Sequence, residues 1–363
     1  MNKIFLDRLV SQAKTNGMDA VLICPSEELN FLTGFSPSPC QRFQGLFIKS
    51  DGTMFYIANL IYVGEVEKAY SKSGVKVYKW SDSEVMADTV HDVLEKEGLT
   101  GKLIGVNSSA LSFWTLQITE KSGVKFTNAK PLLEEIRIIK TAEELENLRK
   151  ASAITDAVFS DVVKFVKPGM TEEEISNFIM AGMEKHGATS RRGIVAVGAN
   201  SSYPHYRRGD GVVQTQDMLL YDCGCIYKGM HSDMTRMIFI GGITGEQKKV
   251  YEVIREANEA AEAAAVEGAF IPDVDKAARN IIEKAGYGEN FIHRLGHGIG
   301  YMIHEAPDIK QSNPRKLEKG MSFSIEPCII LTGRFGIRME DVVAITENGT
   351  EILNKTTHDL III

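Results

Sequence analysis

The sequence has no excess of basic residues and no long apolar run, and each absence excludes a class of protein. Lys and Arg total 41 against 48 Asp and Glu, which gives a formal net charge of −7. Without a basic surplus the chain is not a general binder of the nucleic-acid backbone, which needs cations to displace counterions. No run approaches the roughly 18 apolar residues of a membrane span, and Asp7 interrupts the N-terminus before a signal core forms. We therefore expect a cytoplasmic protein with no nucleic-acid or membrane partner.

Cysteine is also sparse, since the chain contains only 5, an odd number that gives no disulfide framework. Cys223 and Cys225 form a C-x-C pair, but no second Cys or His pair follows at the spacing of a zinc site. The pair is therefore interpreted as part of a strand. The open question is whether some of the 48 acids are arranged to hold a metal.

Composition and patterning indicate a globular α/β protein with two domains. Apolar residues make up 44% and charged residues 25% of the 363 residues, as in ordinary globular proteins. Short apolar runs at 20–24, 45–48 and 102–106 predict strands, and residues 83–98 have helical spacing. From about residue 133 the pattern changes to long helices followed by hairpins. We predict an N-terminal domain over 1–132 and a C-terminal domain over 133–363.

The second domain carries an internal repeat of two helices and a hairpin. Thr141 and Thr171 open helices that run towards residues 166 and 187, each with a Glu three residues later, as in a capping box. About 100 residues on, Thr244 opens a helix towards residue 266, and Asp273 is expected to cap another that ends near residue 286. Extended, β-rich sequence follows each helix pair.

Each repeat contains a hairpin with one acid on each strand. Residues 218–226 and 231–240 predict two strands around Tyr227–Lys228, which would place Asp222 directly opposite Asp233, with roughly 5 Å between their Cβ atoms. In the second repeat, residues 321–330 and 336–345 flank a loop centred on Gly333, and this places Glu326 opposite Glu340.

Two readings of these acids are open. One opposed pair is most simply explained as solvated carboxylates on the polar face of a hairpin. Two pairs at matching places in a repeat, beside apolar neighbours such as Leu219 and Val342, favour buried acids. Like charges that face each other in a buried sheet are destabilising unless a cation lies between them.

Histidines lie between the two hairpins. His293, His297 and His304, three of the eight in the chain, fall within one short segment. Gly296 and Gly298 flank His297, so its imidazole can reach inward from closely packed backbone.

These motifs resemble the pita-bread metallopeptidases, the family of methionine aminopeptidase, aminopeptidase P and prolidase, in which creatinase is a metal-free relative. The resemblance rests on Asp222-x-Gly224 with Ser232-Asp233-x-Thr235-Arg236, on Gly296-His297-Gly298-x-Gly300 with His304-Glu305-x-Pro307, and on Ile325-Glu326-Pro327 with Gly336-x-Arg338-x-Glu340-Asp341. It implies two divalent metal ions, held by Asp222, Asp233, His297, Glu326 and Glu340. All five ligand residues are present, which disfavours a metal-free reaction.

The resemblance also extends to the N-terminal part. Residues 22–35 and 131–140 are similar to the accessory domain of prolidases and aminopeptidase P, which methionine aminopeptidases generally lack. The implied fold is a creatinase-like α/β domain followed by a pita-bread α+β domain. The implied activity is that of an Xaa-Pro dipeptidase acting as a homodimer. Open alternatives are an aminopeptidase P-like enzyme for longer peptides, a non-peptide C–N hydrolase or lyase, and a non-catalytic binding module.

The resemblance assigns roles to the remaining site residues. Four carboxylates and one imidazole form an oxygen-rich site that favours Mn²⁺, with Co²⁺ and Zn²⁺ as alternatives. Glu326 would relay a proton to the leaving amine, while His205 and His304 would hydrogen-bond the substrate. His293 is expected next to the site, and Arg338 is expected to steady the acids.

One position departs from the family pattern. Many prolidases have an Arg just after His-Glu-x-Pro that contacts the substrate carboxylate, but Asp308 stands here. Arg207 and Arg208 follow His205 closely and are candidates for that cation. The simpler interpretation of these two arginines is solvated loop charge.

Overall fold

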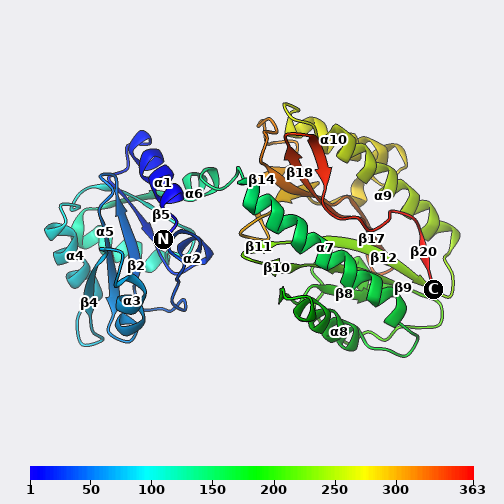
Figure 1. Ribbon diagram of the computed structural model, residues 1–363, viewed down its shortest axis with the longest axis horizontal. Coiled ribbons are helices and arrows are strands. Elements are labelled where there is room, and N and C mark those ends of the chain that lie inside the picture. Colours follow the sequence, from blue (N-terminus) through cyan, green and yellow to red (C-terminus); the bar gives the residue numbers. More distant parts are fainter. The chain divides into compact units, whose positions relative to one another are not determined.

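The computed structural model describes residues 1–363, which form two compact units, Met1–Arg137 and Ile138–Ile363 (Figure 1). The boundary expected after residue 132 falls inside helix α6 (Lys130–Glu135), which belongs to the first unit. None of the helices is both long enough and apolar enough to cross a membrane.

The first unit is a six-stranded mixed sheet with strand order β4-β3-β2-β1-β5-β6 and helices on both faces. Its strands are β1 (Ala20–Ile23), β2 (Gly45–Lys49), β3 (Met54–Asn59), β4 (Lys76–Trp80), β5 (Leu103–Val106) and β6 (Lys125–Asn128). Its helices are α1 (Lys3–Thr15), α2 (Glu27–Thr33), α3 (Val63–Tyr70), α4 (Met86–Lys96), α5 (Ser112–Ser122) and α6. The strands and the helix predicted for this part are confirmed.

Strand β1 shows why this sheet is covered on both faces. Side chains alternate along a strand, and Val21 packs with α1, α3 and α6 while Leu22 packs with α4 and α5. A continuous apolar run is therefore the pattern that a central strand requires.

The second unit begins each of its two halves with a helix pair. The first pair is α7 (Ala142–Phe165) and α8 (Glu172–Lys185), and the second is α9 (Gly245–Ala264) and α10 (Ile271–Lys284). The capping boxes predicted at Thr141 and Thr171 are present, and Thr244, which was predicted to open a helix, also forms one with Gln247.

The cap predicted at Asp273 is wrong, because α10 begins earlier. Phe270 is the N-cap, Pro272 lies in the first turn and Asp273 follows it inside the helix. Proline suits the first turn because it has no N–H to leave unpaired, so the helix starts before the acid.

The strands of the second unit form four sheets, with orders β20-β12-β9-β8, β14-β13-β15-β18-β19, β11-β10-β7 and β16-β17. The strands of the first half are β7 (Thr189–Ser190), β8 (Ile194–Val197), β9 (Asp217–Cys223), β10 (Cys225–Tyr227), β11 (Met230–His231) and β12 (Met234–Ile240). Those of the second half are β13 (Gly296–Gly298), β14 (Glu305–Ile309), β15 (Ser322–Ile325), β16 (Cys328–Leu331), β17 (Phe335–Arg338), β18 (Asp341–Thr346), β19 (Gly349–Ile352) and β20 (Ile361–Ile362). Two short 3₁₀ helices are η1 (Gly198–Ser202) and η2 (Gly288–Asn290).

Strands β9 and β12 lie between two hydrophobic cores. Leu219 and Ile238 pack with α7 and α8, whereas Leu220 and Phe239 pack with α9, α10 and the strands of the second half. The C-terminal strand β20 pairs in parallel with β12. This double burial puts any polar group near the ends of β9 and β12 in a low-dielectric environment.

Candidate metal centre

The hairpin formed by β9 and β12 carries the first two acids, in a register two residues away from the predicted one. Asp222 lies opposite Thr235, not opposite Asp233. The turn centres on Lys228 and Gly229, whose φ angles are 47° and 83°. Two residues with positive φ form the tight turn that matches the twist of a hairpin, so the turn lies one residue later than predicted.

Gly224 keeps the two aspartates on one face in spite of that shift. A Cβ built on Gly224 would lie 1.8 Å from the carbonyl oxygen of Ser232, so only glycine allows the strands to approach so closely there. Asp233 precedes Thr235 by two residues and therefore shares its face of the sheet with Asp222. Both carboxylates line the same pocket.

The second hairpin has the register predicted from Gly333. Ile325 pairs with Asp341 in β15 and β18, and Cys328 pairs with Arg338 in β16 and β17. The same alignment sets Glu326 opposite Glu340 in the gap between these two ladders. The prediction for the second pair of acids is therefore confirmed.

Thr235 and Glu340 join the two hairpins. The amide of Thr235 donates to the carbonyl of Glu340 at 3.4 Å, and the amide of Glu340 donates back at 3.1 Å. The Thr235 hydroxyl also donates to Oε2 of Glu340 at 2.7 Å. This single bridge brings the acids of both halves to one place.

His297 lies on the short strand β13. Its two neighbours must be glycines, because the backbone is packed too closely there for a Cβ atom. A Cβ on Gly296 would lie 1.9 Å from the carbonyl oxygen of Ser324, and one on Gly298 would lie 2.1 Å from that of Ala306. The His297 Nδ1 atom is 3.1 Å from the carbonyl oxygen of Gly298, and its Nε2 atom is 3.3 Å from Oε1 of Glu326.

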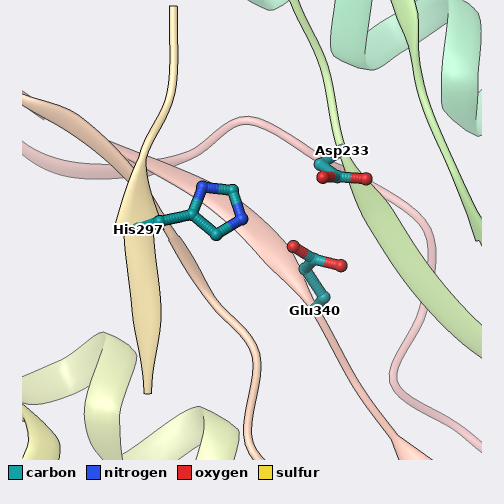
Figure 2. A group of neighbouring side chains, drawn as sticks. All are labelled: Asp233, His297 and Glu340. Atoms are coloured by element: carbon teal, nitrogen blue, oxygen red, sulfur yellow. The ribbon is translucent and has the colours of Figure 1, made fainter. Parts of the chain in front are cut away.

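Three of the predicted ligands converge closely. One ligand atom each of Asp233, His297 and Glu340 lies within 4.8 Å of the other two, and Figure 2 shows these side chains pointing toward one another from three separate segments of the chain. All five predicted ligands line one pocket of about 230 Å³. Arg338 donates to Oδ2 of Asp222 from the wall of this pocket.

Burial makes the pocket unfavourable for negative charge. Burial, followed by the Asp222 charge, raises the pKa of Asp233 well above its usual value, and burial and the Asp233 charge do the same for Glu340. Burial raises the pKa of Glu326 to about 7 and lowers that of His297 to about 3. His297 therefore keeps a neutral imidazole with a free lone pair, and the acids need a positive partner to ionise fully. This donor set fits divalent cations.

The three other predicted histidines occupy different places. His205 and His304 line the pocket, and the His304 ring stands edge-on to that of His297 with 4.2 Å between centroids. His293 does not line it. The Nδ1 atom of His293 is 2.6 Å from the carbonyl oxygen of Arg294, and its Nε2 atom is 2.8 Å from the Cys328 thiol.

The sequence analysis did not identify two arginines that line the pocket. Arg191 and Arg192, in the link between β7 and β8, line the pocket together with Arg207, but Arg208 does not. Arg191 and Arg192 do not belong to a motif with a characteristic spacing. The only sequence feature that could have pointed to them is that two adjacent cations precede a buried strand. Asp308, at the position that departs from the family pattern, pairs with Arg294 and lies 2.7 Å from Lys310.

Comparison with known proteins identifies the class to which this fold and site belong. Residues 146–347 match the model of metallopeptidase family M24, and residues 6–139 match the creatinase/prolidase N-terminal domain. The chain belongs to metallopeptidase family M24, and it is a metallopeptidase of the two-domain kind. This confirms the resemblance and the fold class predicted from the sequence. The family depends on a dinuclear metal centre.

Individual members of the family are similar to this chain over nearly its whole length. The chain is 34% identical to an Xaa-Pro dipeptidase of Lactobacillus helveticus, over 99% of this chain and 98% of the relative. It is 33% identical to an Xaa-Pro dipeptidase of Pyrococcus furiosus, over 98% and 99%. The crystal structure of recombinant prolidase from Thermococcus sibiricus superposes with a TM-score of 0.91 at 32% identity, covering 99% of this chain and 98% of that one.

Proposed function

We propose that this protein is an Xaa-Pro dipeptidase that hydrolyses the peptide bond preceding proline in dipeptides. The observation that carries the proposal is the convergence of four carboxylates and one neutral imidazole in a single pocket. Relatives that match nearly the whole chain, from Lactobacillus helveticus and Pyrococcus furiosus, are named Xaa-Pro dipeptidase. The pocket volume of about 230 Å³ is below the ~300 Å³ at which drug-sized ligand sites begin. A small substrate suits such a volume.

Two divalent ions would be held by Asp222, Asp233, His297, Glu326 and Glu340. The oxygen-rich donor set favours Mn²⁺, with Co²⁺ and Zn²⁺ as the alternatives. When bound, two such ions supply Lewis acidity and make a water molecule acidic enough to lose a proton near neutral pH.

The side chains around these ligands position the substrate and move its proton. Glu326 takes a proton from the attacking water at its carboxylate and delivers it to the proline nitrogen as the peptide C–N bond breaks. His205 and His304, on the pocket wall, donate hydrogen bonds to the carbonyl oxygen of the scissile bond. Arg338 holds Asp222 in place through its hydrogen bond. His293 does not line the pocket, and its ring is held between the Arg294 carbonyl oxygen and the Cys328 thiol, so it supports the site without touching the substrate.

The chemistry of the proline leaving group determines what the enzyme must recognise. The nitrogen of an Xaa-Pro bond is tertiary and carries no N–H, so the enzyme needs a shaped pocket rather than an acceptor for an amide proton. Arg207 lines the pocket and adds positive charge at its entrance. We further propose that the enzyme acts in the cytoplasm and as a homodimer.

The test is the activity of the chelated protein toward Leu-Pro before and after addition of Mn²⁺, Co²⁺ or Zn²⁺. We expect no activity after chelation and recovery with Mn²⁺. The variant Asp233→Asn should stay inactive in the presence of metal, because an amide replaces a charged ligand, while Arg208→Ala, outside the pocket, should match the wild type. Full activity after chelation would refute the proposal. Cleavage of Leu-Pro-Gly in preference to Leu-Pro would instead indicate an aminopeptidase P-like enzyme.

A further inference from the structure

The pocket contains arginine side chains that are not paired with any of its carboxylates. Four guanidinium groups line it, and one of them, that of Arg338, is hydrogen-bonded to Asp222. The other three belong to Arg191, Arg192 and Arg207, and no carboxylate lies within 4.0 Å of their nitrogen atoms. Cations that converge on a pocket without an acidic partner favour an anionic ligand.

The three differ in how well they are placed to bind such a ligand. Arg207 is exposed and donates one Nη1 hydrogen bond, at 3.5 Å, to the carbonyl oxygen of Arg192. Arg192 is exposed as well, whereas Arg191 is half-buried. A half-buried guanidinium is screened less by solvent and loses less freedom when it binds.

Arg191 shares the pocket with residues from both halves of the second unit. Asp233 of the β9–β12 hairpin and His304, which lies just before β14, both line it together with Arg191. A ligand that occupies this pocket therefore lies beside the Arg191 side chain.

Two other cations of the second half, Arg294 and Lys310, are not available for this purpose. Both are paired with Asp308, and neither lines the pocket. A free carboxylate of the substrate thus has to find its partner elsewhere in the pocket, and the segment between β7 and β8 offers the unpaired guanidinium groups.

We propose that Arg191, supported by Arg192, binds the C-terminal carboxylate of the substrate and so restricts the enzyme to dipeptides. This inference rests on the proposed function. A planar guanidinium pairs with a carboxylate through two parallel hydrogen bonds. In a longer peptide the carboxylate lies at least one residue farther from the scissile bond, and an amide occupies the place that Arg191 serves.

The experiment compares Leu-Pro with its C-terminal amide, Leu-Pro-NH₂, on the full-length enzyme loaded with Mn²⁺. Arg191→Ala should raise KM for Leu-Pro by roughly tenfold to a hundredfold, the worth of a charge-assisted hydrogen bond, and should leave KM for the amide unchanged. Arg191→Lys should show a smaller loss, since lysine keeps the charge but not the fork. Arg192→Ala should also lose less, because Arg192 is exposed.

Arg208→Ala is the matched control, since it removes a neighbouring cation outside the pocket and should behave as wild type with both substrates. Loss of activity by Arg191→Ala that is equal for the acid and the amide would overturn the inference, as would no loss for either. In both cases the wild type still cleaves Leu-Pro and the proposed function stands. A wild type that cleaves neither substrate would overturn the proposed function and this inference with it.

Discussion

Raising the pH should destabilise the metal-free protein, and Glu326 gives the size of the effect. Its carboxyl group is buried, and its pKa rises from 4.5 to about 7 in the folded chain. Between these two values the folded state keeps a proton that the unfolded chain has released, so stability falls as the pH increases. At 1.36 kcal/mol for each pKa unit, the loss from this one group is about 3 kcal/mol, complete once the pH is above about 7. Asp233 and Glu340, with raised pKa values, act in the same direction.

The assay is urea denaturation of the chelated protein at several pH values between 5 and 8, for the wild type and Glu326→Gln. The glutamine does not titrate, so the wild type should lose about 3 kcal/mol of unfolding free energy relative to the variant across this range. If Mn²⁺ occupies the proposed site, it should stabilise the ionised carboxylates and abolish this loss, with release of protons on binding. Parallel pH curves for the two chelated proteins would refute the reasoning.

Further predictions concern the groups that hold the site together. Arg236→Met should lower the free energy of unfolding by about 3–5 kcal/mol, because it strips Asp341 of an ion pair that spans 2.6 Å at full burial; a change below about 1 kcal/mol in chemical denaturation would contradict this. Gly224→Ala should reduce bound metal measured by elemental analysis, since its Cβ would meet the Ser232 carbonyl oxygen at 1.8 Å, and undiminished metal content would count against that geometry. In His358, burial opposes the charge, but the hydrogen bond and charge of Asp341 outweigh it and raise the pKa above 6.5. The stabilisation by this histidine is therefore present at low pH and lost as the pH rises through that raised pKa, so the Tm difference between the wild type and His358→Gln should shrink on going from pH 6 to pH 9.

The two hairpins show what the sequence can and cannot predict about register. Around Gly333 the loop has one natural centre, and the balance of residues about it placed Glu326 opposite Glu340 correctly. In the first hairpin both Tyr227–Lys228 and Lys228–Gly229 fit the pattern. Only the left-handed conformation of a lysine decides between them, and a non-glycine residue rarely adopts that conformation.

The sequence could predict the pocket residues that belong to motifs, but not those that lie outside any motif. Asp222 and His297 lie beside glycines that close packing demands, and this constraint is visible in the sequence. The contact of His293 with Cys328 depends on the path of β16, which no local sequence pattern predicts. Arg191 reaches the pocket through the fold of the first repeat alone, so only the tertiary structure identifies it.

The Thr235–Glu340 bridge has a consequence for how the chain acquires its metal during folding. Its two residues are 105 positions apart in the sequence, and Arg338 and Asp222 are 116 apart. Contacts between such distant segments form late, because the chain entropy lost in closing a long loop must be met before the contact stabilises anything. A nascent chain that has only its first half folded holds two aspartates but lacks the histidine and both glutamates. With the proposed ligands we therefore expect metal to bind only after the whole second unit has folded, so that a protein truncated within the second repeat should emerge from synthesis without bound ions.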